Sequence, residues 1–202
     1  FSESTGVNTD WQDETYQLAR TNSINLSYRG GNFKKNLSLN LGLFDQEGVI
    51  VNSTNKRMFL NTSIKRKAFN DKIDVFSRTN ISYKKGNASS VGNGQVFMQK
   101  SVVSQVLQFQ PIYSLLETGE NDDIYSGLNE GDLISNPYTL AKYVVDEKKS
   151  IRLRQAMSIV GKLSPKLTAT FKGAFDYQKN TRDNYYPSKT TRGYINNGEA
   201  SQ

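Results

Sequence analysis

The feature that most constrains this chain is an alternation of leucine with small or polar residues between residues 36 and 50. The alternating positions are Leu37, Leu39, Leu41 and Leu43, with Ser38, Asn40 and Gly42 between them. Successive side chains of a β-strand point to opposite faces, so this stretch predicts a strand with one apolar and one polar face. The alternation stops at Phe44 and Asp45, and Gly48 indicates a turn. A soluble sheet and a membrane barrel could both use such a strand.

Similar alternation recurs along the chain and predicts six strands. Their expected ranges are 22–29, 36–45, 57–67, 73–84, 151–163 and 167–178. The connections alternate between short turns, near Gly31, Asn70 and Pro165, and long segments at 46–55, 85–149 and beyond 179. Short turns at one end and long loops at the other are typical of outer-membrane barrels. A tilted membrane strand needs roughly 9–11 residues, which these ranges supply.

The composition fits a membrane barrel better than a soluble core. Only 36% of the residues are hydrophobic, and a barrel permits this because half of each strand faces a wet lumen. No apolar run is long enough for a transmembrane helix. Six strands cannot close a barrel, since the smallest bacterial ones have about 8. Either more strands lie outside residues 1–202, or the membrane interpretation is wrong. On the membrane interpretation we expect residues 1–202, which begin at Phe1 without an initiator Met, to be part of one transmembrane β-barrel domain of a longer protein.

The sequence offers little material for catalysis. It contains no Cys and no His, which removes thiolate and imidazole chemistry and their metal sites. The acidic residues of the long loop lack the spacing of a calcium-binding EF-hand, namely Glu117, Glu120, Asp122, Asp123, Glu130 and Asp132. Basic residues gather at the strand ends rather than among aromatic residues, which disfavours nucleic-acid binding. We expect no enzyme activity, no cofactor and no metal site.

Strand periodicity assigns side chains to two faces. In a barrel, the lumen-facing set would be Asn40, Asn61, Arg78, Asn80, Arg154, Lys172 and Asp176. The lipid-facing set would be Leu37, Leu39, Leu41, Leu43, Leu60, Ile64, Ile81, Ile159 and Phe171. Phe44, Tyr83, Phe175 and Tyr177 fall towards the long-loop ends and are interpreted as an interfacial aromatic girdle.

Seven basic residues are expected near the level of that girdle. They are Lys56, Arg57, Lys84, Lys85, Lys148, Lys149 and Arg152, in a chain of net charge +7. Two interpretations stay open. The residues form a solvated rim, or they pair with the phosphates of lipopolysaccharide in the outer leaflet.

The long segments hold weaker signals. Residues 1–20 are interpreted as a surface loop anchored by Trp11, although a short helix over 13–20 is an alternative. Apolar residues near helical spacing occur between Val96 and Phe109, and a short helix is expected over 139–145. A loop as long as 85–149 is usually functional.

Taken together, several motifs resemble the early barrel of SusC/RagA-type TonB-dependent outer-membrane transporters. They are NTDWQDE at 8–14, INLSYRGG at 24–31, LNLGLFDQEGVI at 39–50, KRMFLNTSI at 56–64 and NPYTLAKY at 136–143. The family's usual form is close to NTDWQDE, NLSVSGG and GYFDQEGIV, so Leu43 departs from it by standing where an aromatic residue is common. The loop at 86–149 carries little of the family's signature.

The resemblance implies a barrel of about 22 strands closed around an N-terminal plug. It implies TonB-driven import of glycans or peptides across the outer membrane of a Gram-negative, Bacteroidetes-like bacterium, with a SusD-like surface lipoprotein as lid. The plug and the segment that contacts TonB would lie outside this chain. The rival hypothesis is a soluble β-sandwich that works as a binding module or surface adhesin.

Overall fold

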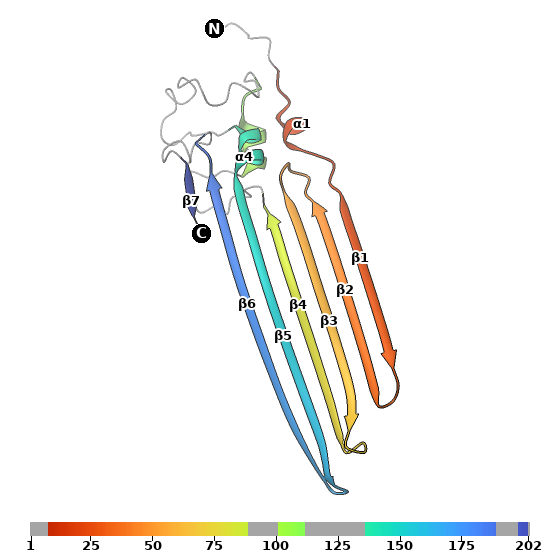
Figure 1. Cartoon of the computed structure of the whole chain (residues 1–202). Coiled ribbons are helices and arrows are strands. Elements are labelled where there is room, and N and C mark those ends of the chain that lie inside the picture. The colour runs from red at the N-terminus through yellow and green to blue at the C-terminus, as the bar shows by residue number, and fades with distance from the viewer. Residues whose placement is uncertain (1–7, 89–100, 112–135, 189–197, 202) are drawn as a thin grey trace, which may run out of the picture.

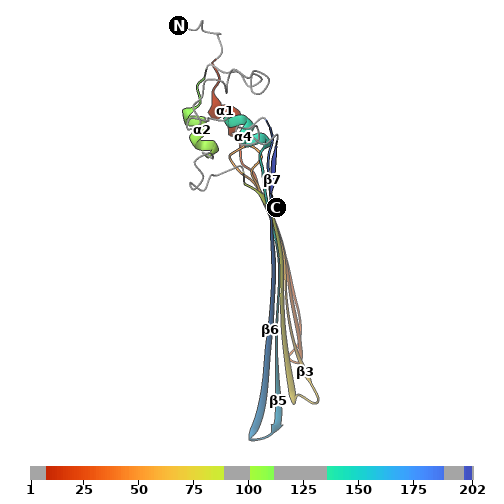
Figure 2. The ribbon, with the colours of Figure 1, turned by 90° about the vertical axis from the view of Figure 1, so that its left-hand side faces the viewer.

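The computed structural model describes the chain except for residues 1–7, 89–100, 112–135, 189–197 and 202. Its main feature is one antiparallel sheet in which the strands follow one another in chain order. Figure 1 shows the long strands side by side, with the helices gathered beyond one end of the sheet. Seen edge-on in Figure 2, the sheet is a single gently curved layer. The described strands therefore form no second, packed sheet, as the rival β-sandwich would require.

The observed strands include the six that were expected, and each of the six is longer than expected. They are β1 (Thr21–Gly31), β2 (Lys35–Glu47), β3 (Thr54–Ala68), β4 (Ile73–Asn87), β5 (Val145–Ser164), β6 (Leu167–Tyr186) and a short β7 (Glu199–Ser201). The expectation that the chain is irregular after residue 179 is wrong, because β6 continues to Tyr186 and β7 pairs with its end. At 20 residues each, β5 and β6 are about 66 Å long at ~3.3 Å per residue.

Tight turns join the strands at the end away from the helices. Gly31 has φ 134°, a conformation that a side chain would strain, and Asn32 and Lys35 bond to each other just beyond it. The turn between β3 and β4 holds Phe69, Asn70 and Asp71, all at positive φ. Asn and Asp tolerate this region better than most residues, which agrees with the turn expected at residues 68–72.

In the described part of the chain, three short helices lie beyond the other end of the sheet. They are α1 (Trp11–Thr15), α2 (Val102–Gln108) and α4 (Pro137–Tyr143). Each begins after a side chain that accepts hydrogen bonds from the first turn, namely Asp10, Ser101 and Asn136 respectively. Among the described residues, no helix has the length and apolarity needed to cross a membrane.

The buried apolar residues of the described chain gather among these helices rather than along the sheet. The cluster consists of Trp11, Val102, Val106, Leu140, Ala141, Val144 and Tyr186. Trp11 meets Phe109 edge to face with ring centroids 5.0 Å apart, and its indole N–H donates to the Gln110 carbonyl at 3.0 Å. The anchoring role expected of Trp11 is therefore confirmed, although Trp11 starts a five-residue helix rather than sitting in a plain loop.

The helix predictions for the long loop are confirmed in part. α2 falls inside the apolar stretch expected between Val96 and Phe109, of which residues 96–100 lie outside the described part. α4 starts two residues before the expected short helix at 139–145, because Asn136 provides the cap. The acidic residues from Glu117 to Asp132 also lie outside the described part.

Candidate functional site

The sheet presents two chemically distinct faces, which follow from its register. Residues paired across neighbouring strands share a face, and successive residues alternate. All seven residues predicted to face the lumen lie on one face, called here the polar face. All nine residues predicted to face lipid lie on the other, the apolar face. The strand pairing shows that each set of residues shares one face. That one face contacts lipid and the other lines a lumen remains an expectation.

One row of the polar face crosses six strands without an apolar residue. In register order it consists of Ser27, Asn40, Asn61, Asn80, Arg154 and Asp176. Asn80 donates from its side-chain amide to the Asn61 amide oxygen at 2.6 Å. The buried side-chain oxygen of Asn40 has no hydrogen-bond partner among the described residues. A continuous polar row suits a wall against water or a polar partner rather than a protein core.

The row ends in a compact ion cluster on β5 and β6. Arg152 donates two hydrogen bonds to the Asp176 carboxylate, at 3.0 and 2.6 Å, and Arg154 donates a third at 3.0 Å. One carboxylate is thus shared by two guanidinium groups, and the cluster keeps a net positive charge. Arg78 and Lys172 lie on the same face closer to the tight turns, and no carboxylate lies within 4.0 Å of their charged groups in the described part of the chain.

The apolar face is bare. Its side chains include Ile24, Leu26 and Phe171, which are 64, 62 and 61% exposed. The four alternating leucines of β2 lie on this face with no sheet or helix packed over them in the described part of the chain. A large exposed apolar surface indicates contact with lipid or another partner. Because the opposite face is polar, we interpret the apolar face as the one that contacts lipid, and this assignment is a proposal.

A polar patch in the middle of the apolar face was missed by sequence reasoning. The amide nitrogen of Gln155 donates to Ser77 Oγ at 2.8 Å, and the Thr79 hydroxyl donates to the amide oxygen of Gln155. The three side chains satisfy one another, which lowers the cost of placing them among apolar neighbours. By alternation, Gln155 falls among the apolar positions of β5, so the sequence already indicated a polar residue on the apolar face. Its partners became apparent only from the register.

The structure corrects the expected aromatic girdle. Phe44 lies on the polar face, where the Arg57 guanidinium stacks over its ring at 5.6 Å, so it cannot share a lipid interface with Tyr83. Phe175 lies level with Thr79, near the middle of β4 rather than at its loop end. Tyr177 lies level with Ile81 and is therefore also near the middle of β4. Tyr83 keeps the expected place, on the apolar face towards the loop end.

The expected basic rim also divides between the faces. Lys56, Lys85 and Lys149 lie on the apolar side, where the first pairs with Asp45 at 3.2 Å and the other two with Glu147 at 2.8 and 2.5 Å. Hydrogen bonds from Lys149 and then Lys85 lower the pKa of Glu147, which lies beyond the tyrosines. The remaining four, Arg57, Lys84, Lys148 and Arg152, lie on the polar face. A single outer-leaflet rim of all seven is therefore wrong.

Comparisons with known proteins agree with this architecture. No protein-family model matches the chain. A relative described as TonB-dependent receptor P3, from Formosa agariphila, is 30% identical over 148 residues, which is 71% of this chain. The solved structure of the RagAB peptide importer in its closed-closed state covers 93% of this chain with a TM-score of 0.66 at 18% identity. This chain spans only 14% of the first protein and 21% of the matched chain of the second.

Proposed function

From the premise that this chain is a barrel segment of a SusC/RagA-type TonB-dependent transporter, we propose that the whole protein imports glycans or peptides across a Gram-negative outer membrane. The observation that carries the proposal is the two-faced sheet. A continuous polar face and a bare apolar face lie on strands long enough to cross a bilayer. In the proposal the polar face lines the lumen around a plug, and the apolar face contacts lipid.

The energy source and partners belong to the same proposal. TonB would act through the N-terminal part that precedes this segment in the family. A SusD-like lipoprotein would close the barrel on the side of the helices, where the long connections emerge. The relative named as a TonB-dependent receptor and the peptide importer of similar fold support this. The helices give this end a packed cluster around Trp11, which supplies a structured surface for a lid.

Lipopolysaccharide remains a proposed contact in a narrower form. Only the three lysines on the apolar side, Lys56, Lys85 and Lys149, could meet outer-leaflet phosphates. Their carboxylate partners must then share them with the lipid. Replacing all three by glutamine in the full transporter should reduce co-purifying lipopolysaccharide. Unchanged lipid content would remove this contact from the proposal.

The proposed function can be tested on the full-length protein in its native membrane. The purified protein should require detergent and migrate differently on a gel before and after heating. A deletion strain should lose growth on, or uptake of, one class of glycan or peptide. Loss of TonB should reproduce the same defect. Import that continues without TonB, or a full-length protein that stays soluble without detergent, would refute the proposal.

Co-purification tests the lid separately. The full transporter should bring down a lipoprotein encoded beside it, and weakening the helix cluster with Trp11→Ala should reduce the yield of the complex. A transporter that imports its solute without any associated lipoprotein would refute the partner while leaving the importer intact.

A further inference from the structure

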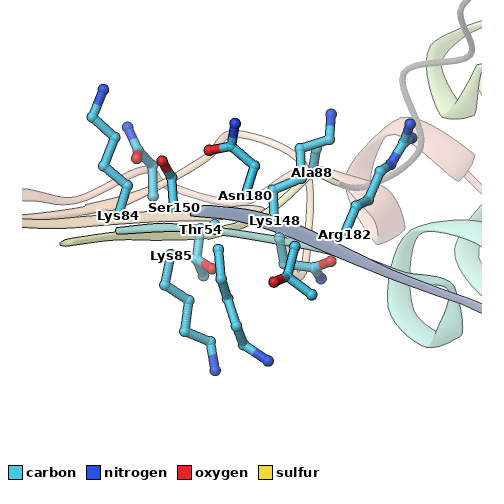
Figure 3. A pocket seen from close by; sticks show the side chains of 13 residues that line it. Thr54, Lys84, Lys85, Ala88, Lys148, Ser150, Asn180 and Arg182 are labelled. Atoms are coloured by element: carbon cyan, nitrogen blue, oxygen red, sulfur yellow. The ribbon is translucent and has the colours of Figure 1, made fainter. Parts of the chain in front are cut away.

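The polar face carries a pocket of about 520 Å³ near the ends of β4, β5 and β6. Gly86 lies at its floor, paired with Asn55 on one side and Lys148 on the other. A Cβ at Gly86 would lie 2.9 Å from the backbone oxygen of Thr54, so this position is closely packed against β3. The hollow is bounded by the side chains of the neighbouring residues on this face. Figure 3 shows Lys84, Asn180 and Arg182 on one side of the sheet and Lys85 on the opposite side.

The side chains around the hollow on the polar face include three cations, although most of the exposed wall of the pocket is apolar. Lys84, Lys148 and Arg182 bring positive charge, and Asn55, Ser150 and Asn180 bring amide and hydroxyl groups. Lysine and arginine donate and cannot accept. A pocket lined in this way is complementary to a carboxylate or another oxyanion.

Arg182, one of the three cations, is held in place by a buried carboxylate. Arg182 makes two hydrogen bonds to Asp146, at 2.7 and 2.9 Å, and Asp146 is only 6% exposed. The Asp146 backbone N–H is bonded in turn to the Asn87 side chain at 2.9 Å. Arg182 is thereby oriented, although its charge is largely offset. Lys148 lies 4.0 Å from the same carboxylate, and Lys84 has no carboxylate within that distance in the described part of the chain.

The charge balance differs sharply between the two faces at this level of the sheet. Over the three rows of the polar face that include residues 84, 86 and 88, four cations face one carboxylate. These residues are Arg57, Lys84, Lys148 and Arg182, against Asp146. Over the interleaved rows of the apolar face, four cations meet four carboxylates. These are Lys56, Lys85, Lys149 and Lys179, against Asp45, Glu47, Glu147 and Asp183.

This contrast argues against a merely solvated rim, for which we would expect a similar balance of charge on both faces. The same strands neutralise their cations on one side and leave an excess on the other, around a hollow. In a barrel the polar face is concave and is backed by the low-dielectric lipid on the other side of the sheet. This arrangement concentrates the electric field of the excess charge in the lumen. An anion that approaches from the loop end would meet this site first.

We propose that this pocket binds the acidic group, a carboxylate, sulfate or phosphate, of the transported solute at the entrance of the lumen. The inference rests on the proposed function and adds that the solute is anionic. Lys84 and Lys148 supply the charge available to the ligand, and Arg182 and Asn180 orient it. The competing occupant is an acidic side chain of the protein's own plug, which the test must separate from a solute.

The chain offers a matched control for the experiment. Lys84→Gln with Lys148→Gln removes two positive charges from the polar face at the pocket. Lys162→Gln with Lys166→Gln removes the same charge from exposed positions at the tight-turn end of β5, away from the pocket. Both variants are made in the full-length transporter, purified in detergent. Binding is measured by fluorescence anisotropy with labelled hexaglutamate and labelled hexagalacturonate. Hexaglutamine and a neutral hexasaccharide are the uncharged probes.

At low salt, the polar-face variant should bind one or both acidic probes about tenfold more weakly, as expected for two partly exposed ion pairs. The control variant should stay within about twofold of the parent even at low salt. About 46 Å of strand separates Lys162 from Lys148 at ~3.3 Å per residue, which exceeds the Debye length of about 30 Å at 0.01 M salt. Lys84→Arg with Lys148→Arg should restore binding. Which acidic probe binds tells whether the acid belongs to a peptide or a sugar.

Other outcomes overturn the inference. Equal weakening by both variants would mean a general charge effect. Acidic probes that bind no better than neutral ones, together with a lower unfolding temperature of the polar-face variant, would assign the lysines to the plug. If the protein takes up a neutral solute in a TonB-dependent way and ignores the acidic probes, this inference fails while the proposed function stands. Import of no solute under TonB control would instead refute the proposed function.

Discussion

Replacing Leu41 by arginine tests the orientation of the whole sheet. Leu41 is the midpoint of β2, six residues from either end, so about 20 Å of strand lies on each side at ~3.4 Å per residue. If β2 spans a bilayer with a tilt of about 45°, Leu41 lies roughly 14 Å along the membrane normal from either end, near the middle of a hydrocarbon core of about 30 Å. An arginine at the midplane on the lipid side costs about 2–4 kcal/mol.

The neighbouring residue supplies the control. Asn40 sits at the same depth but on the polar face, level with Asn61, so Asn40→Arg should cost less than about 1 kcal/mol. Both variants are made in the full-length protein and folded into lipid vesicles. The fraction that keeps heat-modifiable migration is then followed against guanidinium concentration.

A Leu41→Arg variant that unfolds at a clearly lower denaturant concentration than Asn40→Arg would support the assignment of the faces. An equal cost at both positions, or a greater cost at Asn40, would refute it, because Leu41 would then face water or Asn40 would be the buried position.

Three further predictions concern other parts of the sheet and its helices. Trp11→Ala should expose the helix cluster to protease and hydrogen exchange at a local cost of about 3–5 kcal/mol while the strands keep their protection, and simultaneous loss of protection in the strands would contradict a separate cluster. Gln155→Ala should cost about 1–2 kcal/mol by leaving the Ser77 and Thr79 hydroxyls without their partner, and replacing all three with apolar residues should recover most of it; a triple variant that is less stable still would argue that the patch has another partner. Because lysine hydrogen bonds hold the pKa of Glu147 below its ordinary value of 4.5, its stabilisation is present above that pH and is lost as pH falls through the folded value. The difference in melting temperature between the parent and Glu147→Gln should therefore vanish in acid, and a difference that grows on acidification would contradict this sign.

The strands and their faces could be predicted from the sequence because both depend on a period of two residues. Leu37 to Leu43 and the polar residues between them fix the side-chain alternation before any partner strand is known. The absence of His and Cys likewise excluded classes of chemistry without a structure. The resemblance carried by NTDWQDE and LNLGLFDQEGVI then pointed to a transporter.

The upper ends of β5 and β6 depended on tertiary structure. Residues 145–150 and 179–186 lack apolar alternation, so they read as loop. They become strand because each pairs with the other and places Arg182 on Asp146 and Lys149 on Asp183. Cross-strand ion pairs join residues more than thirty positions apart, a distance over which periodicity carries no information.

Position in the sheet also decided the candidate site. Lys84 and Lys85 are adjacent in the sequence and looked alike, as two members of one basic rim. The register sends them to opposite faces, where Lys85 meets Glu147 at 2.8 Å and Lys84 lines a hollow at Gly86. The sequence by itself determined that each strand has two faces. Only the register determined which charges share a face, because that depends on how far each strand slides along its neighbour.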